Sequence, residues 1–183
     1  MQANIAIGLL ETSSIARGIL ACDAMVKTAA VRLAKAAAVP RGKYVIMVTG
    51  TTGEVESALR AGRQAAGDTL IHQFIIRNVH EAVLAALDKR VPAEALEAVG
   101  IIETKDAIAA VHAADEAAKA AKVHLLEVRA VAPGGKGYVT LTGEVGAVRS
   151  AVAAGIQVVP QGALVSHVVI PMAHEALLAS IGK

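Results

Sequence analysis

The sequence predicts an α+β (α/β sandwich) fold of two tandem units, each with a four-stranded antiparallel sheet and helices. The main observation is a repeat, because AVGIIET at Ala98–Thr104 restates AIGLLET at residues 6–12 after 92 residues (98 − 6). Identical residues recur further along, while two single-residue insertions raise the offset from 92 to 93 and then to 94. The recurring residues are Asp23 and Asp115, Lys27 and Lys119, Gly42-Lys43 and Gly135-Lys136, and His80-Glu81 and His174-Glu175. This pattern indicates the duplication of one compact domain, since solenoid repeats are shorter and more numerous.

The second observation is the apolar periodicity of the first unit, which alternates between strand and helix patterns. Runs of alternating or β-branched apolar residues predict strands at residues 4–11, 31–37, 43–48 and 70–76. Apolar residues three and four apart predict helices at residues 14–29, after the turn at residues 50–53, and at residues 79–87. Ser14 is suited to begin the first helix, and Pro40 with Gly42 forms the turn of a hairpin.

The second unit repeats the same order of elements. Strands are expected at residues 98–103, 123–130, 137–142 and 163–170, and helices at residues 105–121, 145–155 and in a short segment through Ile181. The order β-α-β-β-α-β-α, with a central hairpin, predicts a ferredoxin-like arrangement in each unit. The two domains are therefore placed at residues 1–90 and 96–183, joined by a charged linker at residues 88–97 that contains Pro92.

Composition excludes several classes of protein. The hydrophobic fraction is 55% and the mean hydropathy +0.54, but no apolar run approaches the roughly 18 residues that a membrane span needs. A net charge of +2 and the absence of Trp give no basis for nucleic-acid binding. The first residues lack a basic signal region, so a cytoplasmic protein is expected. The alanine-rich helices predict surfaces that are buried by oligomerisation.

Motifs for catalysis or metal binding are absent from the sequence. It contains no GxSxG, HExxH or P-loop, and the six histidines have no metal-ligand spacing. The His-Glu pairs at His80 and His174 are best explained as helix caps, and Cys22 as a small apolar residue of a helix. We therefore expect no catalytic residues, no metal site and no enzymatic activity.

Several segments in order resemble one family. AIGLLETSSIARGILACDAMVKTAAV, the hairpins GKYVIMVTG and GKGYVTLTG, and the ending VIPMAH resemble the bacterial microcompartment (BMC) shell domain. The resemblance covers nearly the whole chain, and two such units in tandem resemble the trimer-forming shell proteins. With the G-x-x-E-T strand first in both units, the order is similar to the propanediol-utilisation T-type shell proteins rather than to the circularly permuted tandem kinds.

The resemblance implies a homotrimeric, pseudo-hexameric tile in the microcompartment shell, with a central pore for metabolites. It implies other shell proteins, hexameric and pentameric, as partners, and enclosed enzymes as further candidate partners. By position, the tile-edge lysines are Lys27 and Lys119. The implied pore-lining residues are Val39, Pro40, Arg41, Gly42, Pro133, Gly134, Gly135 and Lys136. Three-fold repetition of Arg41 and Lys136 would give a positive collar that favours anionic metabolites.

Three positions depart from the family pattern. The T-type relatives carry a cysteine before the pore-loop proline, where three copies hold an iron–sulfur cluster, but this chain has Val39. We therefore expect no cluster, because such clusters are held by thiolates. The edge arginine of the closing motif is replaced by Asn78 and Met172, which concerns contact between tiles rather than the fold.

Two other classes of function stay open at this point. A PII-like signalling trimer would share the ferredoxin-like fold and the oligomeric state. It would need convergent polar groups at a ligand site between subunits, and the sequence offers no such set. A degenerate enzyme ranks lower, since no catalytic constellation is present.

Overall fold

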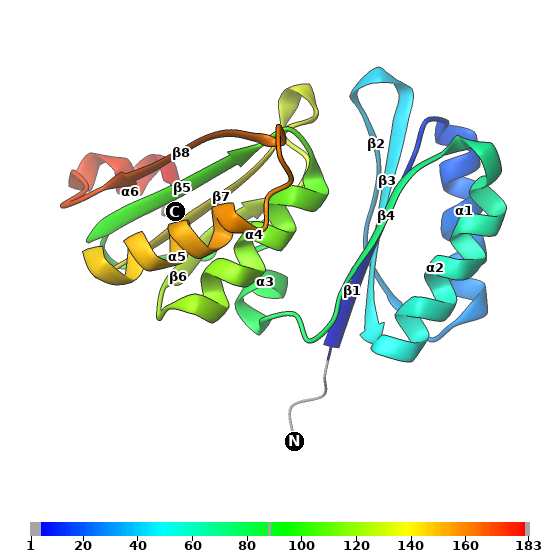
Figure 1. The fold of residues 1–183 in the computed structure, drawn as a ribbon, viewed down its shortest axis with the longest axis horizontal. Coiled ribbons are helices and arrows are strands. Elements are labelled where there is room, and N and C mark those ends of the chain that lie inside the picture. Colours follow the sequence, from blue (N-terminus) through cyan, green and yellow to red (C-terminus); the bar gives the residue numbers. More distant parts are fainter. Residues whose placement is uncertain (1–4, 88, 182–183) are drawn as a thin grey trace. The chain divides into compact units, whose positions relative to one another are not determined.

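The computed structural model describes residues 5–87 and 89–181. The chain divides into two compact units, Met1–Val79 and His80–Lys183. Each unit is an α+β sandwich with one four-stranded antiparallel sheet, and Figure 1 shows α1 and α2 against one sheet and α4 and α5 against the other. The predicted fold class is therefore confirmed.

The first unit follows the predicted order of elements. They are β1 (Ile5–Thr12), α1 (Ile15–Thr28), β2 (Arg32–Val39), the 3-10 turn η1 (Pro40–Gly42), β3 (Lys43–Thr51), α2 (Thr52–Ala66), η2 (Gly67–Thr69) and β4 (Leu70–Ile76). The sheet order is β2-β3-β1-β4. Asn4, the expected start of the first strand, lies outside the described residues.

The second unit repeats this arrangement with an additional helix at its start. Its elements are α3 (Glu81–Ala86), β5 (Ala98–Thr104), α4 (Ala107–Ala120), β6 (His124–Arg129), η3 (Pro133–Gly135), β7 (Gly137–Gly143), α5 (Val145–Gln157), β8 (Leu164–Ile170), η4 (Glu175–Leu177) and α6 (Leu178–Ile181). The sheet order, β6-β7-β5-β8, corresponds strand for strand to the first. The strand register is also equivalent in the two sheets. Leu9 pairs with Met47 and Phe74, and its counterpart Ile101 pairs with Thr140 and Val168.

Side chains at the helix starts satisfy backbone amides that have no partner within the helix. The Ser14 hydroxyl accepts a hydrogen bond from the Arg17 amide at the start of α1. Thr51 and Glu54 form a reciprocal capping box at α2. Asp106 caps α4, and Glu144 accepts from two amides of α5. These caps explain why the helices begin directly after the strands.

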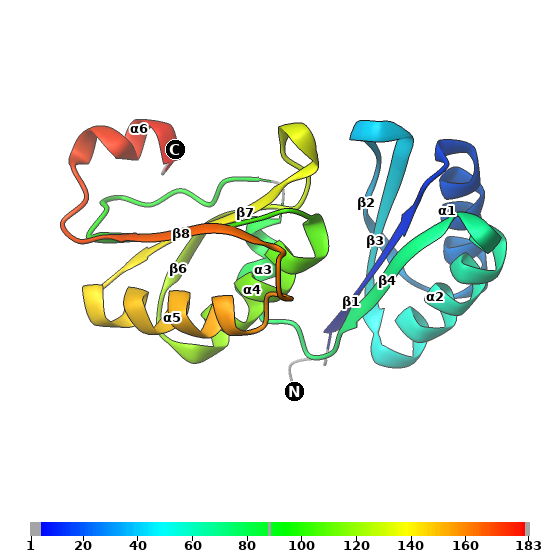
Figure 2. The same cartoon turned by 45° about the horizontal axis from the view of Figure 1, so that its top comes forward.

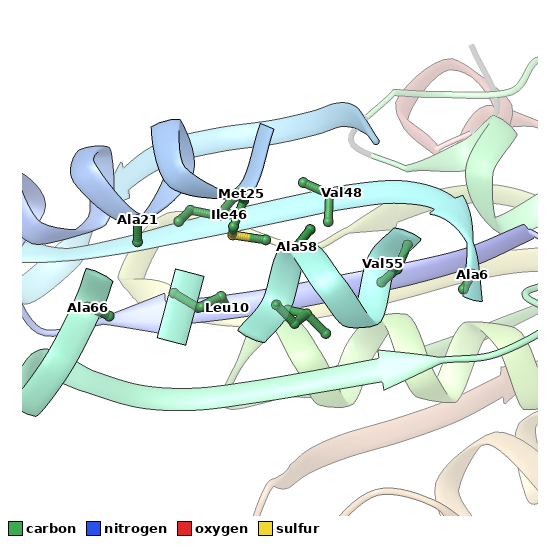
Figure 3. Close-up of a cluster of buried hydrophobic side chains, with 10 residues drawn as sticks. Ala6, Leu10, Ala21, Met25, Ile46, Val48, Val55, Ala58 and Ala66 are labelled. Carbon is green, nitrogen blue, oxygen red and sulfur yellow. The ribbon is translucent and has the colours of Figure 1, made fainter. Parts of the chain in front are cut away.

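The core of the first unit is a thin layer between the sheet and its two helices. Figure 3 shows side chains from β1, β3, α1 and α2 meeting in one cluster, in which Leu10, Met25 and Ile46 are fully buried. Small residues let the helices approach closely, because a Cβ at Gly62 would lie 2.7 Å from Sδ of Met25. The scarcity of large aromatic residues therefore fits the observed packing.

The helix α3 packs with the second unit, although the repeat places it at the end of the first. It lies against β6 and α4 (Figure 1). The following segment runs beside the edge strand β6, where the Val91 amide donates to the Leu126 carbonyl at 2.8 Å and Arg90 bridges to Glu127. The expected linker thus also covers a strand edge, which sequence pattern alone did not indicate.

Glycines at equivalent positions of β1 and β5 are required by this packing. A Cβ at Gly8 would lie 2.6 Å from Cγ1 of Val55, and one at Gly100 would lie 2.7 Å from Cγ2 of Val152. Both neighbours are β-branched valines on a helix, which cannot rotate away freely.

We predict that Gly8→Ala and Gly100→Ala each lower the free energy of unfolding by about 1–3 kcal/mol, because each overpacks the sheet–helix layer. Urea unfolding followed by circular dichroism measures the effect. Gly53→Ala is the matched control: nothing lies within 4 Å of its Cβ position, so a small gain of up to about 1 kcal/mol is expected from helix propensity. Equal midpoints for Gly8→Ala and wild type would contradict the close packing.

Candidate functional site

The two hairpin turns that the sequence assigns to a pore have nearly the same backbone. Each is a 3-10 turn between strands, η1 after β2 and η3 after β6. Arg41 and Gly42 have φ of 67° and 72°, and Gly134 and Gly135 have φ of 80° each. Arg41 thus holds a left-handed conformation where the second repeat uses glycine, at a cost of roughly 1 kcal/mol.

A lysine at the foot of each hairpin is neutralised by a glutamate from the first strand of its unit. Lys136 Nζ lies 2.6 Å from Oε1 of Glu103, and Lys43 Nζ lies 3.1 Å from Oε1 of Glu11. Lys136 is thus paired although it is exposed, whereas Arg41 is exposed at the tip of its turn, and the collar of Arg41 and Lys136 stays a prediction. Sequence analysis missed both glutamates, although the E-T and G-K motifs recur together in the two repeats.

The position at which the family resemblance implies an iron–sulfur ligand carries a valine. Val39 ends β2 directly before the hairpin turn, and its hydrocarbon side chain cannot coordinate iron. Cys22 lies on α1 and not in the hairpin, and its thiol pKa is raised, first by burial and second by the nearby charge of Asp23. Within residues 5–87 and 89–181, no group of three or more His, Cys, Asp or Glu is placed to hold a metal ion.

The Asp-Lys motif of the two repeats has two different environments. On α1, Lys27 and Asp23 form a 2.7 Å ion pair with side chains 73% and 51% exposed. On α4, Lys119 lies 2.5 Å from Asp115, whose side chain is only 1% exposed. The second oxygen of Asp115 accepts the main-chain N–H of His80 at 2.8 Å. Asp115 therefore anchors the start of α3, a role that sequence analysis did not assign.

The two histidines of the repeated His-Glu pair cap the segments that follow them. Nδ1 of His80 accepts from the Ala82 amide at 3.2 Å, and Nδ1 of His174 accepts from the Ala176 amide at 3.1 Å. The capping interpretation is therefore confirmed.

The residues at the expected tile edge also have left-handed backbone conformations. Asn78 has φ of 54° and Met172 has φ of 48°. Asparagine tolerates this region, whereas methionine does not favour it. Met172 is moreover 91% exposed, so a large apolar side chain is presented to solvent on a strained backbone.

Comparison with known proteins agrees with this arrangement of two matching units. The BMC domain family matches residues 6–79 and 98–173, one match in each repeat. The chain belongs to the BMC domain family. The recognition made from the G-x-x-E-T strand, the D-A-M-V-K helix and the paired hairpins is thereby confirmed.

Relatives of full length share the tandem organisation. The bacterial microcompartment shell protein PduT from Citrobacter freundii is 39% identical over 174 residues, which cover 94% of this chain and 95% of that protein. A solved microcompartment protein from Desulfitobacterium hafniense DCB is 44% identical, with a TM-score of 0.91 over 97% of this chain and 99% of its own. A shorter relative matches only about half of this chain. The major carboxysome shell protein CsoS1A from Halothiobacillus neapolitanus is 42% identical over 89 residues, which cover 47% of this chain and 91% of that protein.

These relationships decide the class of function. A tandem BMC protein of this kind is a structural component of a bacterial microcompartment shell, as the resemblance predicted, and the PII-like alternative is not supported. None of the helices among the described residues is long and apolar enough to cross a membrane.

Lys27 and Lys119 are expected to differ in their effect on stability. Lys119→Ala removes the cation beside a buried carboxylate, so we predict a loss of about 1–3 kcal/mol. Lys27→Ala breaks an exposed pair and should change stability by less than about 0.5 kcal/mol. Thermal unfolding of the two variants measures the difference, and equal shifts would contradict the buried role of Asp115.

The valine at position 39 also gives a spectroscopic prediction. Protein purified without oxygen should be colourless and hold no stoichiometric iron or labile sulfide, because Val39 replaces the thiolate. Iron analysis and visible absorption measure this. Val39→Cys is the informative variant, since it introduces a thiolate at the position that the resemblance implies for a cluster ligand. Iron bound by wild type and retained in Cys22→Ser would overturn the argument.

Proposed function

We propose that three copies of this chain form a pseudo-hexagonal tile of the shell, in which six BMC domains surround a central pore. The observation that carries the proposal is an apolar, exposed face on α1. Ile15, Ile19, Leu20 and Val26 are 40%, 54%, 48% and 41% exposed. Adjacent apolar side chains on one helix favour a protein contact that buries them.

The number of copies follows from the duplication and the family resemblance. A chain with two BMC domains contributes two of the six positions in such a ring, so three chains complete it. A head-to-tail contact that closes on itself leaves no open end, which accounts for a discrete tile rather than a fibre.

The hairpins η1 and η3 are the proposed pore lining. Gly42 and Gly134 are exposed in these turns, and Arg41 of η1 is exposed as well. Since Glu103 pairs with Lys136, three arginines rather than six cations would surround the opening. A modest preference for anionic metabolites is therefore proposed.

The proposed contacts between tiles involve Lys27, Lys119, Asn78 and Met172. Lys27 is the best placed of the lysines, since its side chain is 73% exposed. Met172 is suited to a seam between tiles because it would bury a large apolar side chain there. Other BMC shell proteins, hexameric and pentameric, are the proposed neighbours in the shell. We propose a structural role without catalysis, with any reaction carried out by the enclosed enzymes.

Purified protein is predicted to be a homotrimer of about 56 kDa, three times 18.6 kDa, that forms hexagonally packed sheets. Light scattering after size exclusion measures the mass, and negative-stain microscopy shows the sheets. Lys27→Asp should abolish the sheets and leave the trimer intact, because it reverses an exposed charge away from the core. Lys105→Asp, another exposed lysine, is the matched control.

Two outcomes would contradict the proposal. A stable monomer at micromolar concentration would leave the apolar face of α1 without a partner. Loss of the trimer in Lys27→Asp would place this lysine between chains of one tile rather than between tiles.

A further inference from the structure

The segment that follows the last strand is almost the same in both repeats. Residues 80–87 read HEAVLAAL and residues 174–181 read HEALLASI, so five of the eight positions are identical and the other three are small or aliphatic in both. The first copy contains α3, which packs on β6 and α4 of the second unit. The second copy contains η4 and α6, and among the described elements α6 packs chiefly on η4. Figure 2 shows α6 away from α4 and α5.

The surface of α4 and β6 on which α3 packs is called the seat of α3 below. The His80 amide donates to Asp115 on α4 at 2.8 Å. Beside this bond, Ala82 and Ala85 line a shared pocket of about 340 Å³ with Val123 and Leu125 at the start of β6. Asp115 is fully buried, and Leu125 is 2% exposed.

The first unit has the same seat, but it is open. The repeat offset of 92 places Asp23 at the position of Asp115 and Leu33 at that of Leu125. Strand pairing supports this equivalence, because Leu33 lies opposite Val48 and Leu125 opposite Leu141. The Asp23 side chain is 51% exposed and Leu33 is 43% exposed.

The neighbouring positions of the helices show the same contrast. Ile19 is 54% exposed, whereas its counterpart Val111 is fully buried. Cys22 is partly exposed, and its counterpart Ala114 is fully buried. The first unit therefore carries equivalent side chains in an exposed seat, where Oδ2 of Asp23 bonds Lys27 as Oδ2 of Asp115 bonds Lys119.

We infer that residues 174–181 of one copy occupy the seat on α1 and β2 of the next copy, with Asp23 accepting the main-chain N–H of His174. The inference rests on the proposed trimer and assigns its chain-to-chain contact. Each chain then supplies one segment and one seat, which makes a head-to-tail contact that closes into a ring. A second copy of this chain is the fitting occupant, because its segment is nearly the one that fills the equivalent seat within the chain.

The contact explains why both repeats keep aspartate and lysine one turn apart. An exposed ion pair contributes little to the stability of a helix. A carboxylate that meets the amide at the start of a docked segment contributes more, since a charged acceptor strengthens the bond.

The first test compares the association of two variants. Asp23→Ala should raise the Kd of the trimer about tenfold or more, because the His174 amide is buried without an acceptor. Asp23→Asn keeps a carbonyl oxygen and should have a smaller effect. Asp68→Ala removes an exposed acid of η2 and should leave the Kd within about twofold. Sedimentation equilibrium over a dilution series measures each Kd.

The second test locates the contact without weakening it. A variant is made in a Cys22→Ser background with two added substitutions, Val31→Cys and Ala179→Cys. A short bismaleimide should link the two introduced cysteines between neighbouring chains and give covalent trimers. These positions correspond to Val123 and Ala85, which line one pocket. Ala85→Cys with Val123→Cys is the matched control and should link only within a chain. A variant with only one of the two introduced cysteines should give no covalently linked trimer.

Cys22 of the unmodified protein is a third probe. Its thiol should react with maleimide severalfold more slowly above the Kd than below it, because its counterpart Ala114 is fully buried. Rates are compared across concentrations at one pH, since Asp23 also raises the pKa of Cys22.

The outcomes separate this inference from the proposed function. A trimeric wild type with an unchanged Kd in Asp23→Ala and no interchain product from Val31→Cys with Ala179→Cys would overturn the inference and leave the tile intact. Monomeric wild type protein would overturn the tile itself. Covalent dimers without trimers would keep the contact but replace the three-fold ring by mutual exchange between two chains.

Discussion

The carboxylate of Asp115 is the interaction on which the organisation of this chain depends. It is buried, and it meets two donors: the Lys119 ammonium and the His80 amide at the start of α3. A buried charge is tolerated only when it is paired and hydrogen-bonded. Asp115 therefore requires α3 to stay on the second unit, and the following segment then lies along the edge of β6.

The same motif in the first unit has a different environment, and this difference indicates how the chain associates. Asp23 and Lys27 have the same spacing as Asp115 and Lys119, but both are exposed. Duplication gives each chain two seats and two segments, of which one pair is used internally. Exposed apolar side chains on α1 mark the unused seat. We therefore propose that this incomplete internal repeat encodes self-association of the chain.

The hairpins show how the two repeats have diverged where no core packing constrains them. Both use left-handed residues, but η1 has Arg41 where η3 has Gly134. The glutamates Glu11 and Glu103 nevertheless pair with the lysine at each hairpin foot. The pairs hold the loops to the first strand of each unit, while the residues at the tips are free to change charge and shape.

The sequence by itself determined the duplication, the order of elements and the family, because period-two and period-3.6 patterns and caps such as Ser14 act over a few residues. From Val39 the sequence also predicts that no iron–sulfur cluster is held, and this stays a prediction. Only the tertiary structure decided that α3 packs on the second unit, that Asp115 is buried while Asp23 is exposed, and that Glu103 neutralises Lys136. The physical reason is that burial and charge pairing depend on which distant segments meet, and identical motifs can meet different partners.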